Sequence, residues 1–298
     1  VTSITSATVF EGARGIGQVA AAAIADTVVL YSIGNAQMQG STRPISRLMN
    51  PVRVMNNTQI FRNSWQLPGT MQAIGTIVGN DLPSESREDC AFFHAADIEK
   101  TLLFGQKSGQ VIGTQYLTTM DGLVEVVRRL APAANTTTAG ATTTYTQLQD
   151  ALEPCFNTIV VGQSTNDRIL FVVGGALRVI NDIGRLNGTY QIMDGQTSFG
   201  LQFGTFKTAR GTFRMIQHQI LNSNIVWTKM AIAVHIPSMK LMYLKGRKTS
   251  NQEYGTTGTP VDSGIDAVGG CLTTEMTLQN VNPSAHCVIY GLTAGAVG

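Results

Sequence analysis

Hydrophobic and polar residues alternate along much of this chain, which is the pattern of β-strands with one buried face. Residues 51–67 alternate in this way, and residues 204–221, 226–236, 240–248 and 286–292 are also predicted to form successive strands. Residues 1–48 combine shorter alternating runs with glycine-rich turns, which indicates an extended β element. In the first long run the alternation breaks around Asn56 and Asn57. We therefore expect a large share of β-structure.

The clearest helix is predicted over residues 83–104. Pro83 suits the first turn of a helix, and Gly105 suits the position just past its end. Apolar residues recur at helical spacing within it, at Ala91, Ala95, Ile98 and Leu102, with Phe92 and Leu103 widening the stripe. This spacing predicts a helix with one buried face.

Two further helices are predicted in the middle of the chain. One begins at about Thr146, after a threonine-rich loop. The other follows a buried strand that starts near Asp167, turns at Gly174 and Gly175, and ends at Gly188. Because helices and strands are both present and no repeat occurs, the predicted fold class is α+β.

Residues 11–25, EGARGIGQVAAAAIA, resemble the glycine-rich turn that binds the phosphates of a dinucleotide. Within them, residues 12–20 contain a loose Gly-x-Gly-x-x-Ala match. That motif needs a buried strand before it, but the preceding residues alternate small polar and apolar types. The acid that binds ribose is also missing, since none occurs between Asp26 and Asp81. A dehydrogenase-like oxidoreductase is therefore only an alternative, and we expect no cofactor.

Composition favours a subunit that is covered by other copies. Charged residues make up 13% of the 298 residues, about half of their usual share in a soluble domain. Neutral surfaces of this kind suit interfaces better than solvent. The four cysteines contain no Cys-x-x-Cys pair, which favours free thiols over a zinc site. Asp26 interrupts the longest apolar stretch, so no membrane span is expected.

No motif for catalysis or metal binding occurs, so we expect no enzyme activity, no catalytic residue and no bound metal. His94 lies beside the predicted helix stripe without a second ligand at metal-binding spacing. His218 and His235 lie within apolar strand patterns. We interpret these histidines as packing or surface residues. Sequence spacing does not test for a triad assembled from distant positions.

Charges of opposite sign are separated along the chain. No acid occurs between residues 27 and 80, where the arginines are Arg43, Arg47, Arg53 and Arg62. Acids then crowd the predicted helix, at Glu85, Glu88, Asp89, Asp97 and Glu99. Opposite patches of this kind can set how copies of one protein bind one another. We take these residues as candidate intersubunit contacts.

A second acid-free stretch extends from residue 195 to residue 252 and is rich in cations. The candidates for contact with phosphate or with another subunit are Lys207, Arg210, Arg214, Lys229, Lys245, Arg247 and Lys248. A net charge of only +2, and no pattern of base-stacking aromatic residues, argue against sequence-specific nucleic-acid binding. The expected contact with double-stranded DNA is non-specific and sensitive to salt.

Three blocks of sequence carry a family resemblance: NPVRVMNNTQIFRNSWQLPGT at 50–70, DIEKTLLFGQKSG at 97–109 and EMTLQNVNPSAHCVIYGL at 275–292. In this order and spacing they are similar to the tailed-bacteriophage major capsid proteins, in the branch typified by podophage SU-ten. In that branch the first block forms a strand before a long spine helix ending in Glu-Lys-x-Leu-Leu-Phe-Gly. An Asn-Pro-x-Ala-His strand closes the fold. The likeness spans roughly residues 10–292.

The resemblance implies a capsid-subunit fold with three parts. An extension loop would cover residues 1–48, and an axial domain would cover residues 126–235. A peripheral domain would combine 49–125 with 236–298 and contain the spine helix and a long sheet. By this resemblance we expect the sequence to begin inside the loop, without the family's N-terminal arm. The glycine motif then belongs to that loop, and its likeness to a dinucleotide site is a coincidence.

The resemblance also implies a function. Family members form hexamers and pentamers that close into an icosahedral shell around packaged double-stranded DNA. The implied partners are other copies, a portal, a scaffold and a cement protein, with assembly in the bacterial cytoplasm and a final place in the virion. The arginines of segment 43–62 would contact the acidic helix of a neighbour. Since the first lysine is Lys100, no cross-link from the loop is expected. A non-catalytic β-rich binding module is a second alternative.

Overall fold

The structure of the chain is a computed structural model. It describes residues 3–4, 10–11, 34, 39–43, 53–74, 82–140, 142–157, 166–186, 204–255 and 266–293. The chain divides into two compact units, 1–53 and 54–298. In the first unit β1 (Ser3–Ile4) pairs antiparallel with β2 (Phe10–Glu11). The glycine motif at 12–20 and Arg47 lie outside the described residues.

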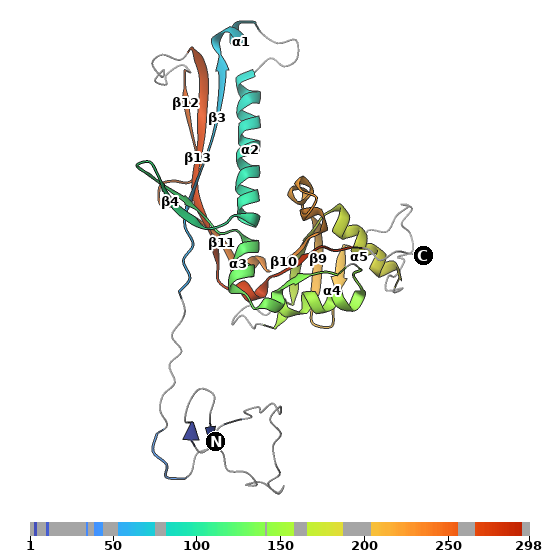
Figure 1. Cartoon of the computed structure of the whole chain (residues 1–298). Helices are drawn as coiled ribbons and strands as arrows, with labels where there is room; N and C mark the ends of the chain where they lie inside the picture. The colour runs from blue at the N-terminus through green and yellow to red at the C-terminus, as the bar shows by residue number, and fades with distance from the viewer. Residues whose placement is uncertain are drawn as a thin grey trace. The chain divides into compact units, whose positions relative to one another are not determined.

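A long antiparallel sheet and a long helix form one part of the second unit (Figure 1). The central strand is β13 (Ala267–Asn280), which pairs with β3 (Gln59–Pro68) on one side. On its other side lie β11 (Met239–Tyr243) and β12 (Ser250–Tyr254). α1 (Gly69–Ile74) follows β3, and α2 (Leu82–Phe104) runs along one face of the sheet. The predicted helix at 83–104 is confirmed.

The side chains of β3 alternate between the two faces of this sheet. Phe61, Trp65 and Leu67 are buried, the first two in clusters with residues of α2 and β13, whereas Ile60 and Arg62 point to the opposite face and are exposed. The strand begins only at Gln59, so the prediction of a strand from residue 51 is wrong for residues 53–58. Polar side chains replace the ladder there, as described below.

The buried face of α2 differs from the predicted stripe. Cys90, His94 and Leu103 are buried, whereas Ala91 and Ala95 are exposed within the subunit. The sheet touches the helix along the line of Cys90 and His94, one position away from the alanines, and a polar side chain occupies part of that line. The periodicity therefore identified the helix and its contacts at Ile98, Leu102 and Leu103, but placed the contact line of the first half about 100° around the axis.

A six-stranded sheet forms the other part of the second unit. Its strand order is β6-β14-β10-β7-β9-β8, with parallel pairing in β6–β14 and β7–β9. The strands are β6 (Thr136–Thr138), β7 (Asp167–Val172), β8 (Thr205–Lys207), β9 (Thr212–Gln217), β10 (Ala231–Val234) and β14 (Cys287–Tyr290). β14 lies in the range 236–298 expected for the peripheral domain, so a boundary at residue 235 does not separate the two sheets.

Two hydrophobic clusters cover the two faces of this sheet. On one face, α4 (Tyr145–Leu152), the 3₁₀ turn η2 (Glu153–Phe156) and α5 (Gly174–Leu186) pack over Leu170, Phe213 and Ile289. On the other face, α3 (Leu123–Leu130) and the end of α2 pack over Ile232 and Val288. The predicted helices at 146 and 174 are confirmed. The 3₁₀ turns η3 (Gln219–Ser223) and η4 (Trp227–Lys229) join this second layer.

Two segments differ from the sequence-based expectations. The Asn-Pro-x-Ala-His block is not a strand: it forms the 3₁₀ turn η6 (Pro283–Ala285), and the strand starts after it, at Cys287. Pro283 cannot donate to a ladder, which favours a turn at this point. A hairpin of β4 (Ser108–Ile112) and β5 (Gln115–Thr119) was not predicted. Its turn places Gly113 at φ +64°.

Candidate subunit-contact surfaces

A polar junction holds the segment at 54–58 that leads into β3. Asn56 Nδ2 donates to the carbonyl oxygens of Asp121, at 3.1 Å, and Leu278, at 2.9 Å, while Asn56 Oδ1 accepts from the Asp121 N–H at 2.8 Å. Asn57 Nδ2 donates to the Ser108 carbonyl at 3.1 Å. These bonds satisfy the backbone groups that strand pairing would otherwise use, which explains why the alternation breaks at the two asparagines.

Asp121 extends the junction to the segment between α2 and α3. Its buried carboxylate accepts from the Lys107 backbone N–H at 2.8 Å and forms an ion pair with Arg129. Lys107 Nζ donates to the Met55 carbonyl at 2.6 Å. The junction therefore ties the segment before β3 to the end of α2, the start of α3 and β13.

His94 links α2 to the long sheet through both ring nitrogens. Its Nδ1 lies 2.7 Å from Asn63 Oδ1, and its Nε2 lies 2.8 Å from Thr274 Oγ1. Burial lowers the pKa of His94 below its ordinary value, and the nearby charge of Asp97 opposes that shift. The interpretation of His94 as a packed residue is confirmed.

Two of the five candidate acids are engaged inside the subunit. Asp97 Oδ2 accepts from Asn63 Nδ2 at 3.1 Å, and Glu99 Oε1 lies 2.8 Å from His218 Nε2. His218 follows β9, so this pair joins α2 to the six-stranded sheet, and the histidine is more than a packing residue. Beside it, the rings of Phe104 and Trp227 stack with centroids 4.0 Å apart.

The other three candidate acids lie on the exposed side of α2. Glu85, Glu88 and Asp89 are all exposed, and none has a hydrogen-bond or ion-pair partner among the residues that the structure describes. The cation between them, Arg87, contacts Glu253 of β12 at 3.3 Å instead. This stretch of the helix surface is therefore an uncompensated acidic patch.

The candidate arginines lie in both units. Arg43 and Arg53 are exposed residues of the first unit, and Arg62 is an exposed residue of β3 in the second. Arg62 lines a polar hollow of about 320 Å³ on the face of the long sheet away from α2. The other lining residues are Gly246, Arg247, Ser250, Gln252 and Thr273. Arg247 forms an ion pair with Glu275.

The second set of cations separates into two groups and one single residue. Lys245, Arg247 and Lys248 share the turn between β11 and β12, next to the hollow that contains Arg62, and Lys248 Nζ lies 5.8 Å from the centre of the Tyr243 ring. Lys207, Arg210 and Arg214 belong to the β8–β9 hairpin, and Lys229 is exposed in η4. Arg210 is paired with Glu153 at 3.7 Å. The cations of the turn were not expected to share a surface with Arg62.

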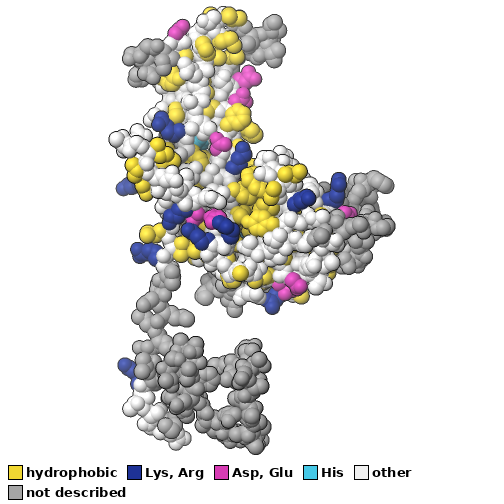
Figure 2. Space-filling view, in the orientation of Figure 1, with side chains coloured by type: hydrophobic (Ala, Val, Ile, Leu, Met, Phe, Trp, Pro, Cys, Tyr) yellow, Lys and Arg dark blue, Asp and Glu magenta, His cyan; other side chains and the backbone are white. Residues whose placement is uncertain are grey.

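Exposed hydrophobic side chains accompany these charges. Figure 2 shows hydrophobic groups beside acidic ones along α2, where Phe92 is 71% exposed and Phe93 is 60% exposed. The β4–β5 hairpin exposes Val111, Ile112, Tyr116 and Leu117 by between 51% and 69%. Large exposed apolar groups of this kind mark interaction surfaces.

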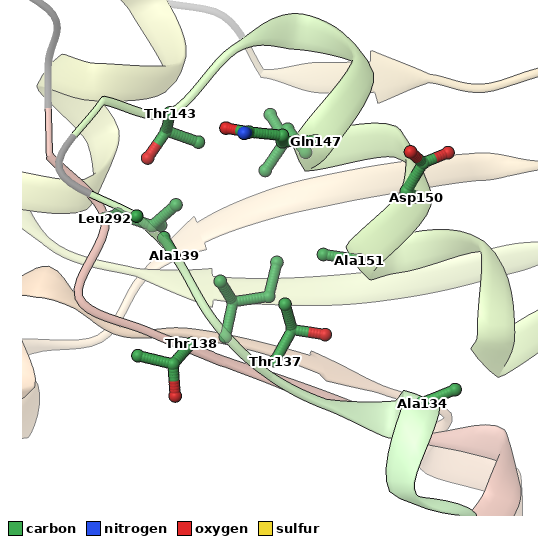
Figure 3. A pocket seen from close by; sticks show the side chains of 12 residues that line it. Ala134, Thr137, Thr138, Ala139, Thr143, Gln147, Asp150, Ala151 and Leu292 are labelled. Atoms are coloured by element: carbon green, nitrogen blue, oxygen red, sulfur yellow. The ribbon is translucent and has the colours of Figure 1, made fainter.

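A pocket of about 350 Å³ lies at the free edge of the six-stranded sheet (Figure 3). It is bounded by β6, the loop after β6 and α4, and Asp150 is its only charged lining residue. None of the predicted site residues lines it. Among the described residues no group of His, Cys, Asp and Glu could hold a metal ion, and no helix is long and apolar enough to cross a membrane.

One buried serine lies near two histidines but lacks the geometry of a catalytic triad. Ser238 Oγ, in the 3₁₀ turn η5 (Ile236–Ser238), donates to the His235 carbonyl at 2.9 Å and lies 3.4 Å from His286 Nε2. Ser238 and both histidines are buried, and none of them lines the two pockets described above. Burial lowers the pKa of His286 to about 3, so this imidazole is a poor base. The interpretation of His235 as a packing residue is confirmed.

Two solved structures share the fold of this chain. A chain of the satellite phage P4 procapsid superposes with a TM-score of 0.51 at 10% identity, covering 92% of this chain and 83% of that chain. A chain of the SrpI encapsulin complex from Synechococcus elongatus PCC 7942 gives a TM-score of 0.51 at 8% identity, covering 83% and 77%. The fold class is therefore the capsid-subunit fold, as predicted.

The sequence narrows this class to one family. Residues 5–293 match the family described as SU10 major capsid protein. The chain is also 35% identical, over 290 residues, to the major capsid protein of Pseudomonas phage PaMx41, covering 94% of this chain and 69% of that protein. The chain belongs to the SU10 major capsid protein family and is a phage major capsid protein. Neither the oxidoreductase nor the binding-module alternative is supported.

Proposed function

We propose that this protein self-assembles as hexamers and pentamers into an icosahedral shell that encloses packaged double-stranded DNA. The family match over residues 5–293 carries the proposal. The low charge content and the exposed apolar groups of α2 and the β4–β5 hairpin support it, because such surfaces are stable when neighbours cover them. Assembly takes place in the bacterial cytoplasm. The protein acts by binding, without catalysis.

The proposed domains follow the family plan. Residues 1–48 form the extension loop, and 49–125 and 236–298 form the peripheral domain with α2 as its spine. Residues 126–235 form the axial domain, to whose sheet β14 adds a strand from the last segment. The Glu99–His218 contact and the Phe104–Trp227 stack support a firm connection between the last two domains. Cohesion between subunits is non-covalent.

The proposed subunit contacts pair opposite charges. The arginines Arg43, Arg47, Arg53 and Arg62 of one copy face the acids of α2 in a neighbour. Glu85, Glu88 and Asp89 are the acids best suited to this role, because Asp97 and Glu99 have partners within their own subunit. Contacts with packaged DNA are non-specific and involve exposed cations of the β8–β9 hairpin and Lys229. A portal, a scaffold and a cement protein complete the set of partners.

Negative-stain electron microscopy of the purified protein in near-physiological salt tests the proposed function. Closed shells, or isolated hexameric and pentameric rings, are the expected result, and the particle diameter then sets the number of subunits. A uniform field of particles no larger than a tetramer would overturn the proposal. A denaturing gel of mature particles tests the non-covalent cohesion, because a ladder of bands above 31.9 kDa would contradict it.

A further inference from the structure

Two surfaces of opposite sign on the second unit each carry three uncompensated charges. The acidic surface is formed by Glu85, Glu88 and Asp89 of α2, with Phe92 and Phe93 following along the helix. All five side chains are exposed. The three carboxylates have no partner among the described residues, so their charge is available to another molecule.

The basic surface lies on the long sheet, around the hollow lined by Arg62. Arg62, Lys245 and Lys248 have no acidic partner in the described part of the chain, whereas the charge of Arg247 is offset by Glu275. Ile60, which is 50% exposed, and Met242, which is 48% exposed, accompany these cations. Each surface therefore combines three uncompensated charges with exposed apolar groups.

The two surfaces cannot meet within one copy. Side chains alternate along β3, so that Phe61 and Asn63 contact the α2 side while Ile60 and Arg62 point to the other face. Cys90 and His94 turn the opposite side of α2 toward the sheet, which leaves the three carboxylates pointing away from it. The sheet thus lies between the acidic surface and the hollow.

We propose that the acidic surface of one copy docks on the basic surface of the next copy. The carboxylates of α2 contact Arg62 and the lysines of the β11–β12 turn, while Phe92 and Phe93 cover Ile60 and Met242. Charge-assisted bonds from an arginine to a carboxylate are short and directional, so the hollow fixes the register of the contact. Three charges of each sign face one another, which excludes the reversed pairing of like surfaces.

Such a contact uses two different surfaces, so every copy offers one surface to each of two neighbours. A heterologous contact of this kind generates a closed ring when the rotation between neighbouring copies equals a full turn divided by the number of copies. The inference rests on the proposed shell function and deepens it, because it assigns the lateral contact of a ring to α2 and to the open face of the long sheet. It also gives Lys245 and Lys248 a protein partner.

Charge reversal followed by compensation tests the contact. Arg62→Glu, and separately Glu88→Lys with Asp89→Lys, should raise the subunit concentration needed for assembly by about tenfold or more. Combining Arg62→Glu, Lys245→Glu and Lys248→Glu with Glu85→Lys, Glu88→Lys and Asp89→Lys should restore assembly, because each surface then carries three charges of the opposite sign. Arg178→Glu, at an exposed cation of α5 outside both surfaces, is the matched control. Circular dichroism of each dissociated variant separates a folding defect from an assembly defect.

Zero-length cross-linking gives an independent measurement on the wild-type protein. Carbodiimide treatment of assemblies made from mixed ¹⁵N-labelled and unlabelled copies should join Lys245 or Lys248 to Glu85, Glu88 or Asp89 in peptides of mixed label. Rings and shells that lack these peptides, and an Arg62→Glu variant that assembles like the control, would overturn the docking proposal while leaving the shell function intact. Wild-type protein that forms no rings or shells would overturn the shell function itself.

Discussion

His286 Nδ1 accepts a hydrogen bond from the backbone N–H of His235 at 3.1 Å, and this bond joins the segment that enters β11 to the segment that leaves β13. Asn135 strengthens the same place by donating to the carbonyl oxygens of Ser284, at 2.8 Å, and His286, at 2.7 Å. The two crossings between the long sheet and the six-stranded sheet are therefore held together by buried polar groups.

The neutral state of His286 makes the subunit less stable in acid. In the unfolded chain this imidazole binds a proton below its ordinary pKa of 6.5, whereas in the folded chain its pKa is about 3. The unfolded state therefore binds more protons between these values, and the free energy of unfolding should fall by up to about 1.4 kcal/mol per pH unit as the pH decreases through this range. Urea titrations of dissociated subunits at several pH values measure the slope. His286→Asn keeps an acceptor near the position of Nδ1 but has no titrating group, so the variant should show a smaller slope of stability against pH. An unchanged slope would contradict the assignment of this pH dependence to His286.

Asn56 should be the most sensitive residue of the polar junction. Asn56→Ala removes two donated bonds and two accepted bonds to backbone groups that stay partly buried, so we expect a loss of about 2–4 kcal/mol in the free energy of unfolding. Asn56→Asp should also destabilise, because it places a carboxylate against two carbonyl oxygens. Chemical denaturation measures both, with Asn222→Ala, at an exposed asparagine, as control. Equal stability of Asn56→Ala and the control would refute this role.

Gly105 and Gly122 should tolerate no side chain. A Cβ at Gly105 would lie 2.6 Å from the Thr101 carbonyl oxygen, and a Cβ at Gly122 would lie 2.6 Å from the Gly105 nitrogen. Gly105→Ala and Gly122→Ala should each cost about 1–3 kcal/mol through backbone displacement. Gly174→Ala has open space and is the control. Thermal unfolding of the three variants measures these losses of stability. Equal midpoints for all three would show that the backbone around Gly105 and Gly122 moves apart easily to admit a side chain.

The β4–β5 hairpin should matter for assembly and not for folding of the subunit. Tyr116→Ser and Leu117→Ser remove exposed apolar groups, so the free energy of unfolding of dissociated subunits should change by no more than about 0.5 kcal/mol. If a neighbour covers the hairpin, the same variants should assemble less completely, as light scattering can measure. Unimpaired assembly of both variants would show that the hairpin stays exposed in the shell.

The elements of the fold were largely predictable because they depend on local periodicity. The helix at 83–104, the strand before Gly174 and the helix after it follow from spacing alone. The contact line of α2 was not predictable, because His94 is buried through bonds to Asn63 and Thr274, which are 31 and 180 residues away. A polar residue in a buried line lowers the apolar periodicity that sequence patterns measure.

The sequence predicted the sign of each charged surface, but not which residues share it. The sequence separated acids from arginines, but it placed Asp97 and Glu99 with Glu85, although the first two have partners inside the subunit. It also separated Arg62 from Lys245, which the pairing of β3 and the β11–β12 turn with β13 places on one sheet. The β4–β5 hairpin was missed although Gly113 and Thr114 form a two-residue turn, a known hairpin signal.

The length of β13 has a mechanical consequence. Fourteen residues form this strand, which pairs with β3 at ten positions and then continues, through η6, into β14 of the second sheet, next to its edge strand β6. A pull along this strand loads the whole ladder of hydrogen bonds in shear, so that all of them resist together instead of opening one after another. The subunit is therefore stiffest along β13.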